Sequence, residues 1–247
     1  MAEFPILSVQ PGDVISDEAL GSKTKFWFRR NNEQWLFKEA RENTGEDWAE
    51  KIAAEVAHLI GISASKVELA EFEGRRGCAL LSFAYQDRNE VLIHGNEILA
   101  GLVLGYDRNK KFRQSDHTLE NITSAIRKLF PSEEISDQVL TTLAGYLVLD
   151  ALIGNTDRHH ENWAILLVAE GATLAVAPSF DHASSLGREL QDVRRQNLMR
   201  PGAVGRYARN GRGAIYLGSE DPRGANPLRL VEFGARRFSK YFLPPLR

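Results

Sequence analysis

The sequence predicts an α+β fold with two lobes, on three observations. Aromatic β-hairpin patterns fill the first third of the 247 residues, helical periodicity dominates from about residue 84 onward, and a short apolar hairpin interrupts the helices. Strands and helices that segregate along a chain are typical of α+β proteins. We therefore expect a small antiparallel β lobe with one helix over residues 1–83, a mainly helical lobe over residues 84–247, and a cleft between them.

A lysine stands out among the predicted strands of the first lobe. Four strands are expected there, at residues 26–28, 34–38, 65–69 and 78–83. In the second of them, strand alternation places Lys38 on the same face as Leu36 and opposite Trp35 and Phe37. A cation at the end of an aromatic-rich strand calls for an explanation, which makes Lys38 a candidate functional residue.

Residues 47–60, between the two strand pairs, have the periodicity of a helix. When each residue is advanced by about 100°, the large apolar side chains fall on one stripe. These are Trp48, Ile52, Val56, Leu59 and Ile60. Glu55 lies at the edge of the stripe, whereas Glu50 points away from it. Because a carboxylate beside an apolar face is costly unless paired, we expect Glu55 to pair with Lys38.

Two longer helices are expected in the second lobe. The first carries Leu119, Ile122, Ile126 and Leu129, with Ser115 as its N-cap and Pro131 as its stop. The second is capped by Ser136 and runs to Gly154, which is suited to end a helix. The second lobe is therefore built mainly from helices.

A short apolar β-hairpin follows the second helix. Its expected strands are residues 163–168 and 173–177, and its turn is Glu170-Gly171. This hairpin carries the chain away from Asn162 and returns it at Asp181. Residues that are separated in the sequence can thereby lie close together.

The chain contains the residue types that a phosphoryl-transfer site requires, namely Asp157, Asn162 and Asp181. Transfer from Mg-ATP requires an acceptor for the proton of the nucleophile, metal ligands, and cations around the phosphates. Asp157 would accept the proton of the attacking hydroxyl, and the side-chain oxygens of Asn162 and Asp181 suit Mg²⁺, a hard cation. Taken alone, Asp157 and Asn162 also fit ordinary helix-end capping. However, the joint occurrence of these residues with Lys38, in this order, is far rarer than any one of them alone.

Lys38 and a turn before it are candidates for binding ATP. We expect Lys38 to contact the α- and β-phosphates and to be held in place by Glu55. The turn consists of Gly21, Ser22, Lys23, Thr24 and Lys25. Its backbone amides and lysine ammonium groups would cover the phosphates. The structural alternatives are a strand-end lysine, a solvated helix carboxylate and a simple turn, since the turn fits neither common glycine-rich phosphate pattern.

Two segments carry a family resemblance. Residues 153–162 read Ile-Gly-Asn-Thr-Asp-Arg-His-His-Glu-Asn, and residues 177–181 read Ala-Pro-Ser-Phe-Asp. They resemble the catalytic and metal-binding segments of the HipA-like serine/threonine kinases, the toxin components of bacterial toxin–antitoxin pairs. The resemblance implies a protein-kinase-like bilobed fold, with ATP and Mg²⁺ as cofactors. It also implies that Asp157 is the catalytic aspartate, that Asn162 and Asp181 bind magnesium, and that Lys38 contacts ATP.

The resemblance has implications for partners and regulation as well. It implies a protein substrate with a serine or threonine acceptor, an antitoxin-like regulator, and autophosphorylation near the glycine-containing turn, here at Ser22 or Thr24. The chain begins almost directly at the nucleotide-binding lobe. We therefore expect a compact member of the family, without the extra N-terminal subdomain of longer HipA proteins.

Residues 188–212 form an arginine-rich segment that matches no motif. The segment contains seven arginines and two acidic residues, in a chain whose net charge is -2. We expect a docking surface for an anionic partner, and the alternative is a solvated loop or helix face. The expected substrate-docking residues are Arg188, Arg194, Arg195 and Arg200.

The amino-acid composition limits where the protein is expected to be located and which partners it is expected to bind. The mildly acidic net charge gives no global basicity for bulk nucleic-acid binding. The single cysteine, Cys78, fits a reducing cytosol, and no segment is long and apolar enough to span a membrane. We therefore expect a cytoplasmic protein without a membrane partner.

Two other functions stay open beside a protein kinase. The pattern Asp-Arg-His-x-x-Asn also occurs in phosphoinositide-type lipid kinases, but the sequence has no amphipathic anchor and no lysine-rich membrane patch. A nucleotide-binding module or pseudokinase would signal by conformation instead of catalysis. Every expected catalytic position is filled, which disfavours the pseudokinase.

Overall fold

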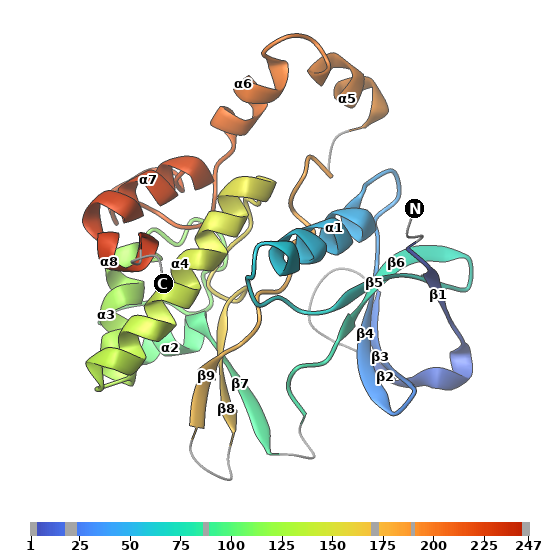
Figure 1. The fold of residues 1–247 in the computed structure, drawn as a ribbon, viewed down its shortest axis with the longest axis horizontal. Coiled ribbons are helices and arrows are strands. Elements are labelled where there is room, and N and C mark those ends of the chain that lie inside the picture. Colours follow the sequence, from blue (N-terminus) through green and yellow to red (C-terminus); the bar gives the residue numbers. More distant parts are fainter. Residues whose placement is uncertain (1–3, 18–23, 86–88, 169–172, 189–190, 244–247) are drawn as a thin grey trace. The chain divides into compact units, whose positions relative to one another are not determined.

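The computed structural model describes residues 4–17, 24–85, 89–168, 173–188 and 191–243. The chain divides into two compact units (Figure 1). Unit 1 comprises Met1–Phe83 and Phe180–Arg200, and unit 2 comprises Ala84–Ser179 and Pro201–Arg247. Strands dominate unit 1 and helices dominate unit 2, which confirms the predicted α+β class. The functional lobes 1–83 and 84–247 stay a prediction, and residues 180–200 pack with unit 1.

A six-stranded sheet, in the order β1-β5-β6-β4-β3-β2, forms most of unit 1 (Figure 1). Its strands are β1 (Ile6–Val9), β2 (Val14–Asp17), β3 (Lys25–Arg30), β4 (Glu33–Glu39), β5 (Val67–Phe72) and β6 (Arg75–Leu81), with the short helix η1 (Pro11–Asp13) between the first two. The pair β1–β5 is parallel and the other pairs are antiparallel. Asn31 and Asn32 turn the β3–β4 hairpin with φ of 52° and 63°, values that asparagine tolerates. The four predicted strands are thus confirmed, with shifted ends.

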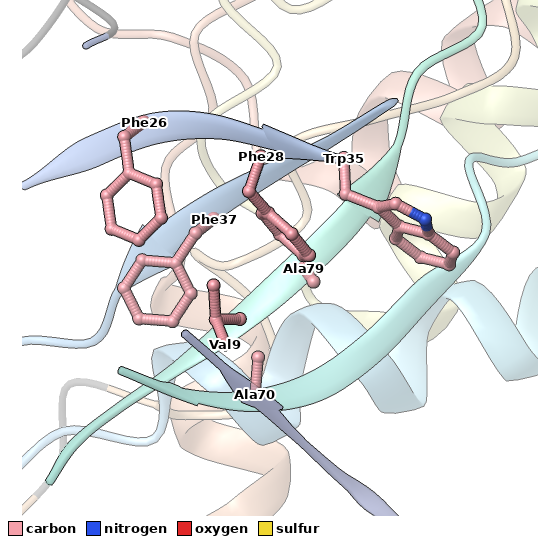
Figure 2. Packing of buried hydrophobic residues seen from close by; sticks show 7 residues of the cluster. All are labelled: Val9, Phe26, Phe28, Trp35, Phe37, Ala70 and Ala79. Carbon is pink, nitrogen blue, oxygen red and sulfur yellow. The ribbon is translucent and has the colours of Figure 1, made fainter. Parts of the chain in front are cut away.

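An aromatic-rich core cluster of unit 1 lies on one face of this sheet. Figure 2 shows its members: Val9, Phe26, Phe28, Trp35, Phe37, Ala70 and Ala79. The rings of Phe26 and Phe37 stack with their centroids 4.8 Å apart. The other face of β4 carries Leu36, which packs against a cluster that includes Ala54 of the following helix. Lys38 shares this second face with Leu36, as strand alternation predicts.

The helix α1 (Glu46–Leu59) packs on β5 and β6 through its alanines. The alanine side chains on its buried face are Ala49, Ala53, Ala54 and Ala57. By contrast, Ile52 and Leu59 are 44% and 84% exposed, so the predicted apolar stripe does not face the sheet. The expectation that Glu50 points away from the core is also wrong, because Glu50 is fully buried. Small side chains let the helix approach the sheet closely, which decides the buried face.

Unit 2 combines helices with a three-stranded sheet in the order β7-β8-β9. The sheet consists of β7 (Glu90–His94), β8 (Ala164–Val168) and β9 (Thr173–Val176). The helices are α2 (Gly95–Leu102), α3 (Leu119–Leu129), α4 (Glu133–Ile153), α6 (Ala203–Asn210), α7 (Pro227–Arg237) and α8 (Ser239–Phe242), while α5 (Asp192–Leu198) belongs to unit 1. The β8–β9 hairpin confirms the prediction, and its expected turn Glu170-Gly171 lies outside the described residues. Strand β7 was not predicted, because its short apolar run becomes a strand only by pairing with β8.

The helix caps of unit 2 differ from those expected. The Oγ1 of Thr118, not Ser115, caps α3 by accepting the N–H of Asn121. Ser132 caps α4, whereas Ser136 lies within its first turns and donates its hydroxyl to the Glu133 carbonyl. Gly154 ends α4 as predicted, with a left-handed φ of 66°. For both α3 and α4, the N-cap is the residue directly before the helix.

Every helix in the described part of the chain is too short or too polar to serve as a membrane span.

The packing of α1 can be tested at two adjacent positions. Ala53 has no exposed surface, so Ala53→Leu should overpack the contact with the sheet and lower the free energy of unfolding by about 1–3 kcal/mol. Ile52→Ala, on the exposed face, should change it by less than about 0.5 kcal/mol. Urea unfolding of both variants checks this. A larger loss from Ile52→Ala than from Ala53→Leu would restore the apolar stripe as the buried face.

Candidate active site

Lys38 and Asp181 form an ion pair within unit 1. The residues are 143 positions apart in the sequence, and Lys38 Nζ lies 3.0 Å from Asp181 Oδ1. Lys38 projects from β4, a strand paired on both sides, and its side chain is only 13% exposed. Burial alone would lower the pKa of Lys38, but the charges of Asp181 and Glu50 raise it above its ordinary value. Lys38 is therefore a fixed cation beside a carboxylate.

Glu50 of α1 is a second carboxylate in the surroundings of Lys38. Its Oε1 accepts a hydrogen bond from the backbone N–H of His182 at 2.9 Å and lies 3.5 Å from His182 Nδ1. Its Oε2 is buried without a hydrogen-bond partner among the described residues. Burial alone would raise the pKa of Glu50, but His182 and the charge of Lys38 hold it below its usual value. Glu50 is thus a buried anion that the charge of Lys38 and a hydrogen bond from His182 stabilise.

The expected pair between Glu55 and Lys38 is wrong. Glu55 Oε1 binds Lys51 Nζ at 2.7 Å, one turn earlier on α1, and Lys51 also binds Glu68 of β5 at 2.9 Å. The side chain of Glu55 is 40% exposed. Glu50 precedes Glu55 by five residues and therefore lies about 140° away around the helix. The α1 carboxylate that influences Lys38 is that of Glu50, which the sequence reasoning missed.

Residues 181–188 are tied to the start of α1. The guanidinium of Arg188 binds Glu46 Oε1 at 2.5 Å, and the carbonyl oxygen of Arg188 accepts the Gly45 N–H. Arg188 also donates to the hydroxyl of Ser184. These bonds give Arg188 a structural role inside unit 1. The predicted docking surface is thereby reduced to Arg194 and Arg200, which are exposed, and the half-buried Arg195.

The backbone of this segment adopts unusual conformations. Asp181 has a left-handed φ of 61°, and Leu186 has a left-handed φ of 56°. Residues other than glycine rarely adopt this region, and they persist there only where surrounding contacts fix the chain. Here the contacts are those of Asp181 with Lys38 and of His182 with Glu50. Such strain is typical of a segment that positions functional groups.

The predicted phosphate-covering turn lies only partly within the described residues. Gly21, Ser22 and Lys23 lie outside them. Thr24 is exposed, and its carbonyl oxygen accepts the Glu39 N–H at 3.1 Å. Lys25 lies directly across from Lys38 in the β3–β4 register. The nucleotide-binding role of this turn stays a prediction.

Asp157 and Asn162 lie in the loop that follows α4 in unit 2. The side-chain nitrogen Nδ2 of Asn162 donates to the carbonyl oxygen of Asp157 at 2.7 Å. The N–H of Asp157 in turn donates to Oδ1 of Asn155 at 3.1 Å. Because Nδ2 of Asn162 is a donor here, Oδ1 is the side-chain oxygen that suits a metal ion. The two ends of the Asp-x4-Asn pattern are therefore joined by a hydrogen bond within one loop.

A buried arginine that the sequence reasoning missed organises this loop. Arg158 binds Asp150 of α4 through Nε and Nη2, each at 2.8 Å, and both side chains are almost fully buried. Its Nη1 donates to the carbonyl oxygen of Asn162 at 2.6 Å, and its Nη2 donates to Ser179 Oγ at 3.0 Å. A bidentate arginine–carboxylate pair is geometrically rigid. One signal was present in the sequence, namely an aspartate within the apolar α4.

Buried histidines lie against the same loop. His160 is 1% exposed, and its Nδ1 is 2.8 Å from the hydroxyl of Tyr106. His117 Nδ1 donates to the carbonyl oxygen of Ala214, and its Nε2 accepts the indole N–H of Trp163 at 3.2 Å. Burial lowers the pKa of His117 to about 3, so this ring stays neutral. These hydrogen bonds hold the buried polar side chains next to the loop in fixed positions.

The side chains of Asn162 and Asp181 fit the oxygen donors that Mg²⁺ prefers. Among the described residues, no group of three or more His, Cys, Asp or Glu side chains could hold a metal ion. Magnesium that is bound with a nucleotide requires only one or two protein carboxylates besides the phosphates and water. Each of these side chains, within its own unit, therefore suits nucleotide-bound Mg²⁺ better than a dedicated all-protein metal site.

Solved structures with a similar fold include kinases. The chain aligns with the Helicobacter pylori proinflammatory kinase CtkA at a TM-score of 0.76 and 18% identity, over 96% of this chain and 84% of that chain. It also aligns with HipA of Shewanella oneidensis MR-1, solved with HipB and operator DNA, at a TM-score of 0.55 and 13% identity, over 94% of this chain and 60% of that chain. The protein therefore has a kinase-like bilobed fold, as predicted.

The chain belongs to the family of HipA-like C-terminal domains. The model of that family matches residues 18–210, which is most of the chain. No curated protein sequence matches the chain. The family predicted from residues 153–162 and 177–181 is thus confirmed.

The dependence of stability on pH should reveal the buried charge of Glu50. Its pKa is held below the unfolded value of 4.5, so its charge contributes stability that is present above pH 4.5 and is lost as the pH falls through the folded pKa. We expect urea unfolding between about pH 5 and pH 3 to show a smaller loss of stability in Glu50→Gln than in the wild type. Glu55→Gln, the exposed control, should keep the wild-type dependence. Identical dependence in all three proteins would contradict the assignment.

Proposed function

We propose that this protein is an Mg-ATP-dependent kinase that transfers the γ-phosphoryl group to a serine or threonine hydroxyl of a protein substrate. The observation that carries the proposal is the 3.0 Å ion pair between Lys38 and Asp181. It brings together the lysine and the aspartate that phosphoryl transfer from Mg-ATP requires. Membership of the HipA-like family and the fold shared with the kinase CtkA support the same reaction class.

The roles follow from the chemistry of each side chain. Lys38 contacts the α- and β-phosphates, and Asp157 accepts the proton of the attacking hydroxyl. Asn162 and Asp181 would hold Mg²⁺, which when bound neutralises phosphate charge. Glu50 positions Lys38, the role that the sequence predicts for Glu55, and it also holds the backbone at His182.

The loop geometry supports Asp157 as the base. Its N–H is bound by Asn155 and its carbonyl oxygen by Asn162, so the backbone on both sides of its side chain is held. Arg158, the next residue, is anchored to Asp150 by two bonds. A base that is fixed before the substrate arrives loses little conformational entropy in the reaction.

Partners and regulation are part of the proposal. The HipA protein of Shewanella oneidensis was solved with HipB, and by analogy we infer an antitoxin-like protein regulator. The exposed Arg194 and Arg200 are proposed to receive an anionic partner, and Ser22 or Thr24 to be autophosphorylated. The chain's single cysteine, Cys78, is buried and reduced, which suits activity in the cytoplasm.

Asp157→Asn should strongly slow phosphoryl transfer while ATP binding remains. An amide cannot accept the proton, and loss of a general base lowers turnover by about 10²–10⁴-fold. Incubation of the purified protein with Mg-ATP and cell lysate, followed by mass spectrometry, measures both activity and the modified residue type. ATP binding with no activity in wild type or variant would instead establish a nucleotide-binding module. Phosphorylation of phosphoinositide vesicles but not of proteins would establish a lipid kinase.

Glu50→Gln should lower turnover by about tenfold or more, because it removes a charge that helps to place Lys38. Glu55→Gln removes the same charge from the same helix at an exposed position and should leave turnover near the wild-type value. Steady-state phosphorylation kinetics, with thermal unfolding of each variant, separate misplacement from misfolding. Equal turnover in the two folded variants would show that Glu50 has no positioning role.

A further inference from the structure

The connection between α2 and α3, residues 103–118, is a long loop with buried anchors. The anchoring side chains of Tyr106, Gln114 and His117 are almost completely buried. Tyr106 binds His160, and Gln114 Nε2 donates to the carbonyl oxygen of Asp107 at 2.7 Å. Ordered loops longer than about 12 residues are uncommon in compact domains and are usually functional. The anchors make this loop part of the folded unit.

The tip of this loop, residues 108–113, is exposed throughout and is here named the basic loop. It contains four cations and no acidic residue: Arg108, Lys110, Lys111 and Arg113. It also presents Phe112, whose side chain is 76% exposed. A single exposed aromatic ring is unremarkable, but a ring flanked by four cations forms a surface that is both apolar and positively charged.

The basic loop is built onto the proposed catalytic loop. Lys111 Nζ lies 2.8 Å from Oε2 of Glu161, the residue before Asn162. Asn96 strengthens the link, because its N–H donates to the carbonyl oxygen of His160 and its Nδ2 donates to that of Arg108. A partner bound to the basic loop is therefore held beside the residues proposed to act on the substrate.

We propose that the basic loop docks an acidic segment of the protein substrate that also carries an apolar side chain. This inference rests on the proposed kinase function and names the class of its substrate. Three cations of the loop, without Lys111, complement carboxylates, and Phe112 complements the apolar side chain. A nucleic acid fits less well, because duplex binding depends on many phosphate contacts and this surface is only six residues long within a chain of net charge -2.

The test measures binding without ATP, so that it does not depend on catalysis. The probe is a short fluorescein-labelled peptide in which aspartate and glutamate flank one leucine and one serine. Binding is followed by fluorescence anisotropy at low and high salt. The test variant is Arg108→Ala with Lys110→Ala and Arg113→Ala, which leaves the Lys111–Glu161 pair intact. The matched control, Arg229→Ala with Arg236→Ala and Arg237→Ala, removes the same charge from exposed positions of α7 in the same unit.

We expect the test variant to bind the acidic peptide about tenfold more weakly than wild type, and the control variant to bind it as wild type does. Binding should also weaken with salt and with Phe112→Ala. Equal affinity for both triple variants, or no preference for the acidic peptide over a neutral one of the same length, would overturn the proposal. So would tighter binding of an RNA oligonucleotide that the test variant loses. If docking holds but no phosphorylation is found, the proposed function fails and the docking surface stands.

Discussion

The ion pair between Lys38 and Asp181 is the interaction on which the functional geometry of unit 1 depends. A buried lysine and a buried glutamate each carry a large desolvation penalty, and neither stays charged without opposite charge nearby. The positive charge of Lys38 offsets the negative charges of Asp181 and Glu50, and His182 is bonded to Glu50. Because these groups come from β4, α1 and the segment after β9, the charges fix the positions of three separate elements.

Much of this arrangement could be predicted from the sequence. The alternation of Phe26, Phe28, Trp35 and Phe37 gives the central hairpin, since only period-two spacing places four aromatic rings in one core. Gly154 marks the end of α4 because it tolerates a left-handed backbone. Asp157, Asn162 and Asp181 can be proposed from the sequence because the chemistry of phosphoryl transfer restricts both residue type and order.

The remainder could not be predicted, because tertiary contacts override local pattern. In α1, a count of large apolar residues selected the face of Ile52, but the sheet accepts the face lined by alanines. That error placed Glu55 rather than Glu50 toward Lys38. Likewise, the sequence does not distinguish Arg158, which is buried in a bidentate pair, from the exposed arginines. A charged residue is buried only where its partner lies, and for Lys38 that partner, Asp181, is 143 positions away in the sequence.

Arg158 in unit 2 and Lys38 in unit 1 use the same physical principle: a buried cation fixes a segment that has no regular secondary structure. Arg158 binds the hydroxyl of Ser179, and Lys38 binds Asp181, which follows Ser179 closely in the chain. Within unit 1, the Lys38–Asp181 ion pair and the bond from the His182 N–H to Glu50 fix the backbone of this segment, where Asp181 keeps a left-handed conformation. A ligand group fixed in this way needs little further ordering when a charged substrate binds.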